Sequence, residues 1–143
     1  MKVMVFGTFD ILHLGHIDVF RQAKQYGDEL IVVVSTDTHV KKIKGKTAVH
    51  TQQERATLLA ELKNISKVVL GSNTDVYTAI REEQPDVIAL GYDQHTFVDA
   101  LQKKLDEYGF THTRIVRLEP YKESQHKSSH IKNTLRRFIA QSV

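Results

Sequence analysis

The sequence predicts an α/β fold built on a single doubly wound parallel sheet of about five strands. Strand-like and helix-like segments alternate along the chain, which is typical of such sheets. The segment Leu30–Val34 is apolar at every position. A strand without polar positions belongs in the middle of a parallel sheet that helices cover on both faces.

Glycines, a proline and capping residues mark where each element begins or ends. Thr51 and Glu54 have the spacing of a capping box, Gly27 and Gly109 are helix stops, and Pro85 ends a helix before it. The expected strands are 2–6, 29–35, 67–70, 86–90 and 113–118. The expected helices are 18–26, 52–62, 75–83, 96–108 and one from Ser128 or Ser129 to about Ile139. This order indicates a Rossmann-like sheet.

The strand order also predicts where a ligand binds. In open parallel sheets, ligands lie outside the carboxyl ends of the strands, where the strand order reverses. We therefore expect the site in the segments that follow the first, fourth and fifth strands, which are 7–16, 91–95 and 119–129.

Composition narrows the class of protein. The 143 residues are 41% hydrophobic and 26% charged, which predicts one domain over residues 1–143. No apolar run is long enough to span a membrane, and the short apolar start does not resemble a signal peptide, so we expect a cytoplasmic protein without membrane contact. The absence of Cys excludes disulfides and thiolate chemistry. The net charge of +3 suits a phosphate-rich ligand and gives only weak support to a nucleic-acid partner.

The loop after the first strand carries the strongest functional signal. It reads Gly-Thr-Phe-Asp-Ile-Leu-His-Leu-Gly-His from Gly7 to His16. His13 and His16 are three residues apart at a helix start, so the two rings can share one side of the helix. Free N–H groups and the helix dipole add positive potential there, and Gly7 lets the backbone approach a ligand. The loop is therefore suited to binding anionic oxygens. Two histidines at this spacing are otherwise most often structural, and a zinc site lacks a third ligand at a persuasive spacing.

This loop resembles the His-x-Gly-His signature of the nucleotidyltransferase superfamily. It is most similar to the cytidylyltransferase-like branch, which includes glycerol-3-phosphate cytidylyltransferase and archaeal-type FAD synthase. The resemblance continues over nearly the whole chain. Its further elements are Lys44 and Lys46, Glu54-Arg55, Gly91-Tyr92-Asp93-Gln94, Tyr121, and the turn Ser128-Ser129-His130-Ile131.

The resemblance implies transfer of a nucleoside monophosphate from a nucleoside triphosphate to a phosphorylated acceptor, with release of pyrophosphate. It assigns His13, His16 and Lys44 to catalysis. It implies nucleotide contacts from Gly7, Thr8, Phe9, Asp10, Leu14, Gly15, Lys46, Arg55, Gly91, Asp93, Tyr121, Lys122, Ser128 and Ser129. Mg²⁺ is expected to bind together with the triphosphate. No metal-ligating residue is expected in the protein. A homodimer is expected from the family.

The sequence leaves open which phosphorylated acceptor and which nucleotide base the reaction uses. The Gly91–Gln94 element is more similar to archaeal-type FAD synthase, which favours adenylyl transfer from ATP to FMN. The alternative is cytidylyl transfer from CTP to glycerol 3-phosphate or a related phospho-alcohol. The last turn departs from the family pattern, with Lys127 and His130 at unusual positions and Lys122 where an Arg is common. A non-catalytic nucleotide-binding module is the alternative of another class.

Other charged and histidine residues fit ordinary surface roles. The segment 41–46 is rich in Lys and reads as a solvated basic loop, with Lys44 and Lys46 equally compatible with a site. The remaining histidines are interpreted as surface residues; these are His39, His50, His95, His112 and His126.

Overall fold

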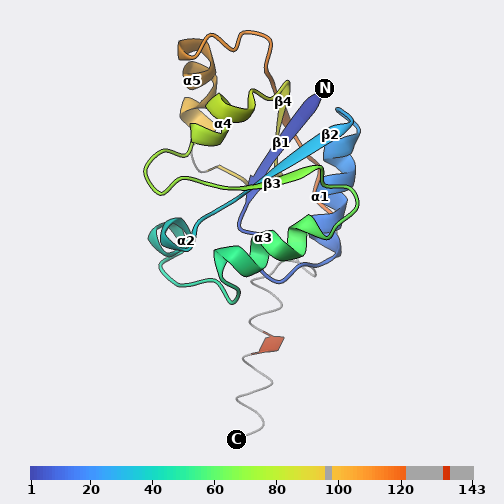
Figure 1. The fold of residues 1–143 in the computed structure, drawn as a ribbon, viewed down its shortest axis with the longest axis vertical. Helices are drawn as coiled ribbons and strands as arrows, with labels where there is room; N and C mark the ends of the chain where they lie inside the picture. Colours follow the sequence, from blue (N-terminus) through green and yellow to red (C-terminus); the bar gives the residue numbers. More distant parts are fainter. Residues whose placement is uncertain (96–97, 122–133, 136–143) are drawn as a thin grey trace, which may run out of the picture.

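The computed structural model describes residues 1–95, 98–121 and 134–135. Five strands and five α-helices alternate in the first two ranges (Figure 1). In chain order they are β1 (Lys2–Gly7), α1 (Leu14–Lys24), β2 (Glu29–Val34), α2 (Asp37–Lys44), α3 (Gln52–Ala60), β3 (Lys67–Leu70), α4 (Thr78–Glu83), β4 (Val87–Leu90), the 3₁₀ turn η1 (Val98–Ala100), α5 (Leu101–Glu107) and β5 (Arg114–Arg117). No described helix is long and apolar enough to cross a membrane.

The five strands form one all-parallel sheet in the order β3-β2-β1-β4-β5. β1 lies at the centre, with Val5 opposite Val32 of β2 and Met4 opposite Ile88 of β4. The chain winds outward in one direction through β2 and β3, and in the other through β4 and β5. The strand order therefore reverses beside β1, and the predicted α/β Rossmann-like fold is confirmed.

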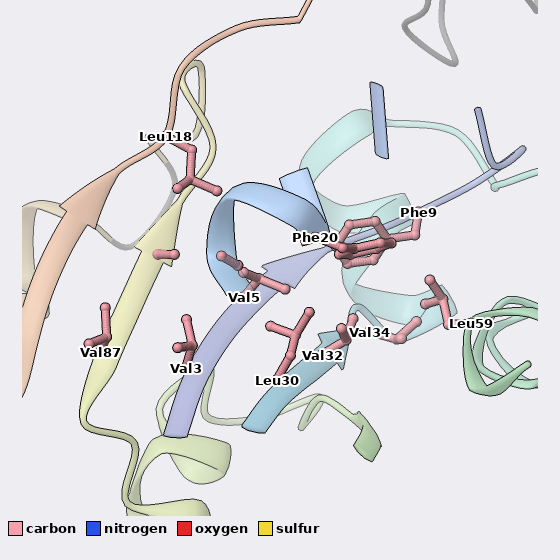
Figure 2. Close-up of a cluster of buried hydrophobic side chains, with 12 residues drawn as sticks. Val3, Val5, Phe9, Phe20, Leu30, Val32, Val34, Leu59, Val87 and Leu118 are labelled. Carbon is pink, nitrogen blue, oxygen red and sulfur yellow. The ribbon is translucent and has the colours of Figure 1, made fainter. Parts of the chain in front are cut away.

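Helices cover both faces of this sheet and enclose two apolar clusters. On one face, Phe20 of α1 and Leu59 of α3 form one cluster with Val3 and Val5. Figure 2 shows Leu59 beside Val34 in this cluster. On the other face, Ile80 of α4 and the Leu side chains of α5 pack on the strand side chains that point to that face. Because successive strand side chains point to opposite faces, Met4 belongs to the second cluster and its neighbours to the first.

Helix α2 is the main departure from the expected elements. The segment predicted as a basic loop is mostly helical, up to Lys44. The Thr36 side chain accepts the N–H of His39 at the start of the helix, and Asp37 lies in the first turn. Gly45 ends the helix in the left-handed conformation, with φ of 75°, and donates to the Lys41 carbonyl. An N-cap, an early acid, late lysines and a final glycine stabilise this helix despite its few apolar residues.

Several boundaries also move. The first helix begins at Leu14 instead of 18, because His13 caps it. The helix expected over 75–83 begins at Thr78. The one expected over 96–108 is divided into η1 and α5. The capping box predicted at Thr51 and Glu54 is confirmed by both of its hydrogen bonds. The helix expected over 128–139 lies outside the described residues, apart from Thr134 and Leu135.

Candidate active site

The two histidines of the β1–α1 loop form the first turn of α1 and its cap. His13 is the N-cap residue, and its Nδ1 accepts the backbone N–H of Gly15 at 3.1 Å. The Nδ1 of His16 accepts the backbone N–H of His13 at 3.3 Å. The two rings stack, with centroids 3.9 Å apart and planes inclined by 25°. The spacing of three residues therefore makes the histidines a reciprocal capping pair.

These hydrogen bonds fix the tautomer of each ring. A ring nitrogen that accepts an N–H carries no proton, so each neutral imidazole has its hydrogen on Nε2. Burial, with smaller contributions from the neighbouring His13 and Lys44, lowers the pKa of His16 to about 3, while Asp10 opposes the shift. His16 is therefore neutral at ordinary pH, and its Nε2–H is a hydrogen-bond donor.

Phe9 holds the loop against His16. Its ring is buried and meets the His16 ring edge to face, with centroids 5.5 Å apart. The Phe9 ring also contacts the Phe20 ring, with centroids 5.3 Å apart. Phe9 and Ile11 adopt positive φ values of 53° and 51°, which are unfavourable for such side chains. A Cβ on Gly7 would lie 2.7 Å from the tip of the Phe9 ring, so this position needs glycine.

Asp10 and Arg55 tie the loop to the rest of the protein. The Asp10 carboxylate accepts the backbone N–H groups of Val49 and His50, at 2.7 and 3.0 Å. Asp10 thereby fastens the segment before α3 to the β1–α1 loop. The nucleotide contact expected of Asp10 stays a prediction.

Arg55 is completely buried. Its guanidinium donates to the carbonyls of Thr8 and Ser35, both at 2.8 Å, and to the carbonyl of His50 at 3.1 Å. It also pairs with Asp37 at 2.8 Å. The described contacts of Arg55 join three loops, and the nucleoside contact expected from the sequence stays a prediction.

A cavity of about 350 Å³ opens at the carboxyl ends of the first four strands. Its walls come from the ends of β1, β2, β3 and β4, from one side of α2, and from the segment between β3 and α4. The lining residues are Val5, Phe6, Gly7, Thr8, Phe9, Val19, Val33, Ser35, Thr36, His39, Val40, Ile43, Lys44, Gly71, Ser72, Val76, Ala89, Gly91, Asp93, Gln94 and His95. The cavity thus lies where the strand order predicts a ligand.

Apart from Asp10 and Arg55, the expected site residues divide into four groups. Gly7, Thr8, Phe9, Lys44, Gly91 and Asp93 line the cavity. His13 and His16 are outside its lining, and Phe9 and Lys44 connect them to it, since Phe9 contacts the His16 ring and the charge of Lys44 acts on His16. Leu14 and Gly15 form the first turn of α1, Lys46 is exposed just beyond α2, and Tyr121 is half-buried. Lys122, Ser128 and Ser129 lie outside the described residues.

Sequence reasoning missed the cavity residues that follow β2 and β3. Ser35, Thr36 and His39 come from the β2–α2 connection and α2, and Gly71 and Ser72 follow β3. His39, interpreted as a surface residue, is half-buried in this wall, and His95 is exposed at the cavity. The rule that selects strand ends would have found the positions after β2 and β3 if applied to every strand.

The segment after β4 is fixed by its own side chain. Gln94 accepts the N–H of Gly91 at 3.2 Å and donates to the carbonyl of Phe6 at 3.3 Å. Arg117 of β5 donates to the Gly91 carbonyl at 2.8 Å. These bonds join the carboxyl ends of β1, β4 and β5, and they hold Asp93 at the cavity.

Comparison with known proteins agrees with this geometry. Residues 4–134 match the model of the family described as Cytidylyltransferase-like. The chain belongs to this family. It is a nucleotidyltransferase.

Curated relatives match nearly the full length of this nucleotidyltransferase. It is 38% identical to the FAD synthase of Thermoplasma acidophilum, over 99% of this chain and 98% of the relative. It is 40% identical to the FAD synthase of Archaeoglobus profundus, over 90% of this chain and 81% of the relative.

Solved structures share the fold. A Thermoplasma volcanium protein described as a lipopolysaccharide core biosynthesis protein is 40% identical, with a TM-score of 0.79 over 85% of this chain and 98% of that one. The pantoate-beta-alanine ligase of Francisella tularensis is 17% identical, with a TM-score of 0.60 over 92% of this chain and 65% of that one. The second likeness concerns the fold alone.

Nucleotidyltransferases of this family generally use a divalent metal together with the nucleoside triphosphate. Within residues 1–95, 98–121 and 134–135, no three His, Asp or Glu side chains gather closely enough to hold an ion. Phosphate oxygens are themselves good ligands for such metals.

Proposed function

We propose that this nucleotidyltransferase is an FAD synthase, which transfers the adenylyl group of ATP to the phosphate of FMN. The proposal is supported by curated relatives that carry this name at 35–40% identity over most of the chain. The Gly91–Gln94 element points in the same direction. In this reaction a phosphate oxygen of FMN attacks the α-phosphorus of ATP, the bond to the bridging oxygen breaks, and pyrophosphate leaves.

One observation carries the chemistry: two stacked histidines whose Nε2–H donors are fixed at the N-terminus of α1 beside the cavity. The reaction needs no covalent intermediate, so catalysis consists of positioning and of stabilising negative charge. Neutral donors that are already oriented stabilise the charge that develops on the α-phosphate without first having to reorganise. His13 and His16 supply these donors in our proposal, and the positive end of the α1 dipole acts on the same oxygens.

The remaining residues take the roles that the family resemblance implies. Lys44 holds acceptor or pyrophosphate charge from the end of α2, and Lys46 adds positive potential. The backbone of Thr8 and Phe9 shapes the phosphate site, and Asp93 faces the nucleoside. Lys122, Ser128 and Ser129 hold the β- and γ-phosphates. Mg²⁺ enters with ATP and neutralises the triphosphate.

The reaction is tested directly by incubating the protein with ATP, FMN and MgCl₂. Chromatography of the flavins and a pyrophosphate assay should show FAD and pyrophosphate forming in equal amounts. Omission of the metal should stop both. A chain that forms no FAD under these conditions, but transfers a cytidylyl group from CTP to glycerol 3-phosphate, contradicts the proposal. A chain that binds ATP and turns over no acceptor is the non-catalytic module.

We also propose a cytoplasmic protein with one domain over residues 1–143, which forms a homodimer as the family resemblance implies. Light scattering after size-exclusion chromatography measures the mass in solution. A mass of twice 16.4 kDa is expected, and a monomer at catalytic concentrations contradicts the dimer.

A further inference from the structure

One side of α2 forms a wall of the cavity whose chemistry changes along the helix. Val40, Ile43 and Lys44 all line the cavity. Residues three and four apart share one face of a helix, so these three side chains form a continuous strip. The strip is apolar at Val40 and Ile43 and cationic at Lys44, in the last turn. A ligand lying along it would meet an apolar surface first and a positive charge at its end.

The apolar part of this strip is enclosed on further sides. Val33 of β2 and Val76, which precedes α4, complete the apolar end of the cavity. Val40 is 3% exposed, whereas Ile43 remains 50% exposed. Ile43 therefore leaves apolar surface in water at the cavity mouth, and a flat apolar ligand would cover it favourably.

The cationic end of the strip is next to the histidines. Lys44 and Phe9 both line the cavity, and the Phe9 ring meets the His16 ring edge to face. The positive charge of Lys44 also acts on His16. The cavity therefore offers an apolar wall and a lysine on α2, and Phe9 connects it to the histidines of α1.

We propose that the apolar end of this cavity binds the isoalloxazine ring of FMN, and that Val40 and Ile43 select this acceptor. The inference rests on the proposed transfer to FMN. FMN has a flat ring with an apolar dimethylbenzene edge at one end and a phosphate at the other, which matches an apolar wall and a lysine in one cavity. A small acceptor such as glycerol 3-phosphate reaches Lys44 without covering Val40 or Ile43. An adenine ring carries nitrogens on both of its rings, whereas the dimethylbenzene edge of isoalloxazine carries none, so the four apolar side chains suit the flavin edge better.

The test measures binding of the flavin ring separately from binding of the phosphate and of the nucleotide. Ile43→Asp places a charge at the apolar mouth, at a position exposed enough to leave folding intact. Leu58→Asp is the matched control, because Leu58 is 45% exposed on α3 and does not line the cavity. Dissociation constants of FMN and of riboflavin, which has the ring but no phosphate, are measured by flavin fluorescence with Mg²⁺ and a non-hydrolysable α,β-methylene ATP. ATP binding is measured by calorimetry.

In Ile43→Asp, we expect the dissociation constants of FMN and riboflavin to rise at least tenfold, with ATP binding changed less than twofold. Leu58→Asp should change neither. Val40→Phe, which fills the apolar end, should also weaken both flavins and provides a second variant. Unchanged riboflavin binding in both cavity variants, or a loss of ATP binding instead, overturns the inference while FAD synthesis by the wild type stands. A wild type that neither binds flavin nor makes FAD contradicts the proposed function as well.

Discussion

His13 and His16 use one nitrogen of each ring for the structure, and in our proposal the other nitrogen acts on the phosphates. Their Nδ1 atoms accept backbone N–H groups at the start of α1, which fixes the rotamer and the tautomer together. The sequence allowed the two rings to be placed on one side of a helix. It did not predict that they cap this helix, because histidine is not among the usual N-cap residues.

Replacing His16 tests the role of the oriented donor. We expect His16→Gln to lower kcat by about 100- to 1000-fold, because one preorganised hydrogen bond to the reacting phosphate is lost or misplaced. KM for ATP should change much less, and circular dichroism should stay that of the wild type. Steady-state kinetics of FAD formation measure the effect. His112→Gln, at an exposed position after α5, is the control. Equal kcat in His16→Gln and the wild type would remove His16 from catalysis.

The lowered pKa of His16 also predicts a pH dependence of stability. In the unfolded chain the imidazole binds a proton near its ordinary pKa of 6.5, whereas in the folded protein the pKa of His16 is lowered to about 3. Between these values the unfolded state binds more protons, so the free energy of unfolding falls as the pH falls. Urea unfolding from pH 7 to pH 4 should show this loss, and His16→Gln should reduce its slope. An identical slope in both proteins would show that His16 titrates normally.

At the scale of elements, Arg55 of α3 holds together the connections around helix α2. Arg55 of α3 reaches the loop after β1, the end of β2 and the segment before its own helix. The resemblance singled out Arg55, and the structure gives the physical reason for an arginine: a planar group with five donors satisfies several carbonyls at once. A lysine at the same place would present a single point of charge.

The Arg55 network predicts two different costs. Arg55→Met should lower the free energy of unfolding by on the order of 3 kcal/mol, because buried carbonyls and Asp37 lose their donor. Asp37→Asn should cost only about 1 kcal/mol, because the Asp37 side chain is 46% exposed and water replaces part of the interaction. Urea unfolding of both variants measures the difference. Arg21→Met, at an exposed position on α1, serves as the control. Similar costs for Arg55→Met and Arg21→Met contradict the network's importance.

Helix α2 shows why some elements were not predicted. Its lysines and single buried valine give a weak apolar pattern, so periodicity alone indicated a loop. Its caps, Thr36 and Gly45, were the stronger signal. The β strands, in contrast, were predicted within one or two residues, because each is a compact apolar run with a clear stop.

At the scale of the whole molecule, parallel winding about β1 brings distant segments together. The ends of β1, β2, β3 and β4 all contribute to one cavity. The sequence predicted this edge of the sheet, because strand alternation implies right-handed crossovers and a common carboxyl end. It did not predict which side chains turn into the cavity, since that depends on packing such as that of Phe9 on Gly7 and His16.

A competition assay tests the central claim most directly. The protein is supplied with equal concentrations of ATP and CTP, equal FMN and glycerol 3-phosphate, and MgCl₂, and all products are separated by chromatography. We expect FAD to account for nearly all of the pyrophosphate released, with His16→Gln lowering the total but not the product ratio. A CDP-linked glycerol product in excess of FAD would contradict the assignment of the acceptor and the base.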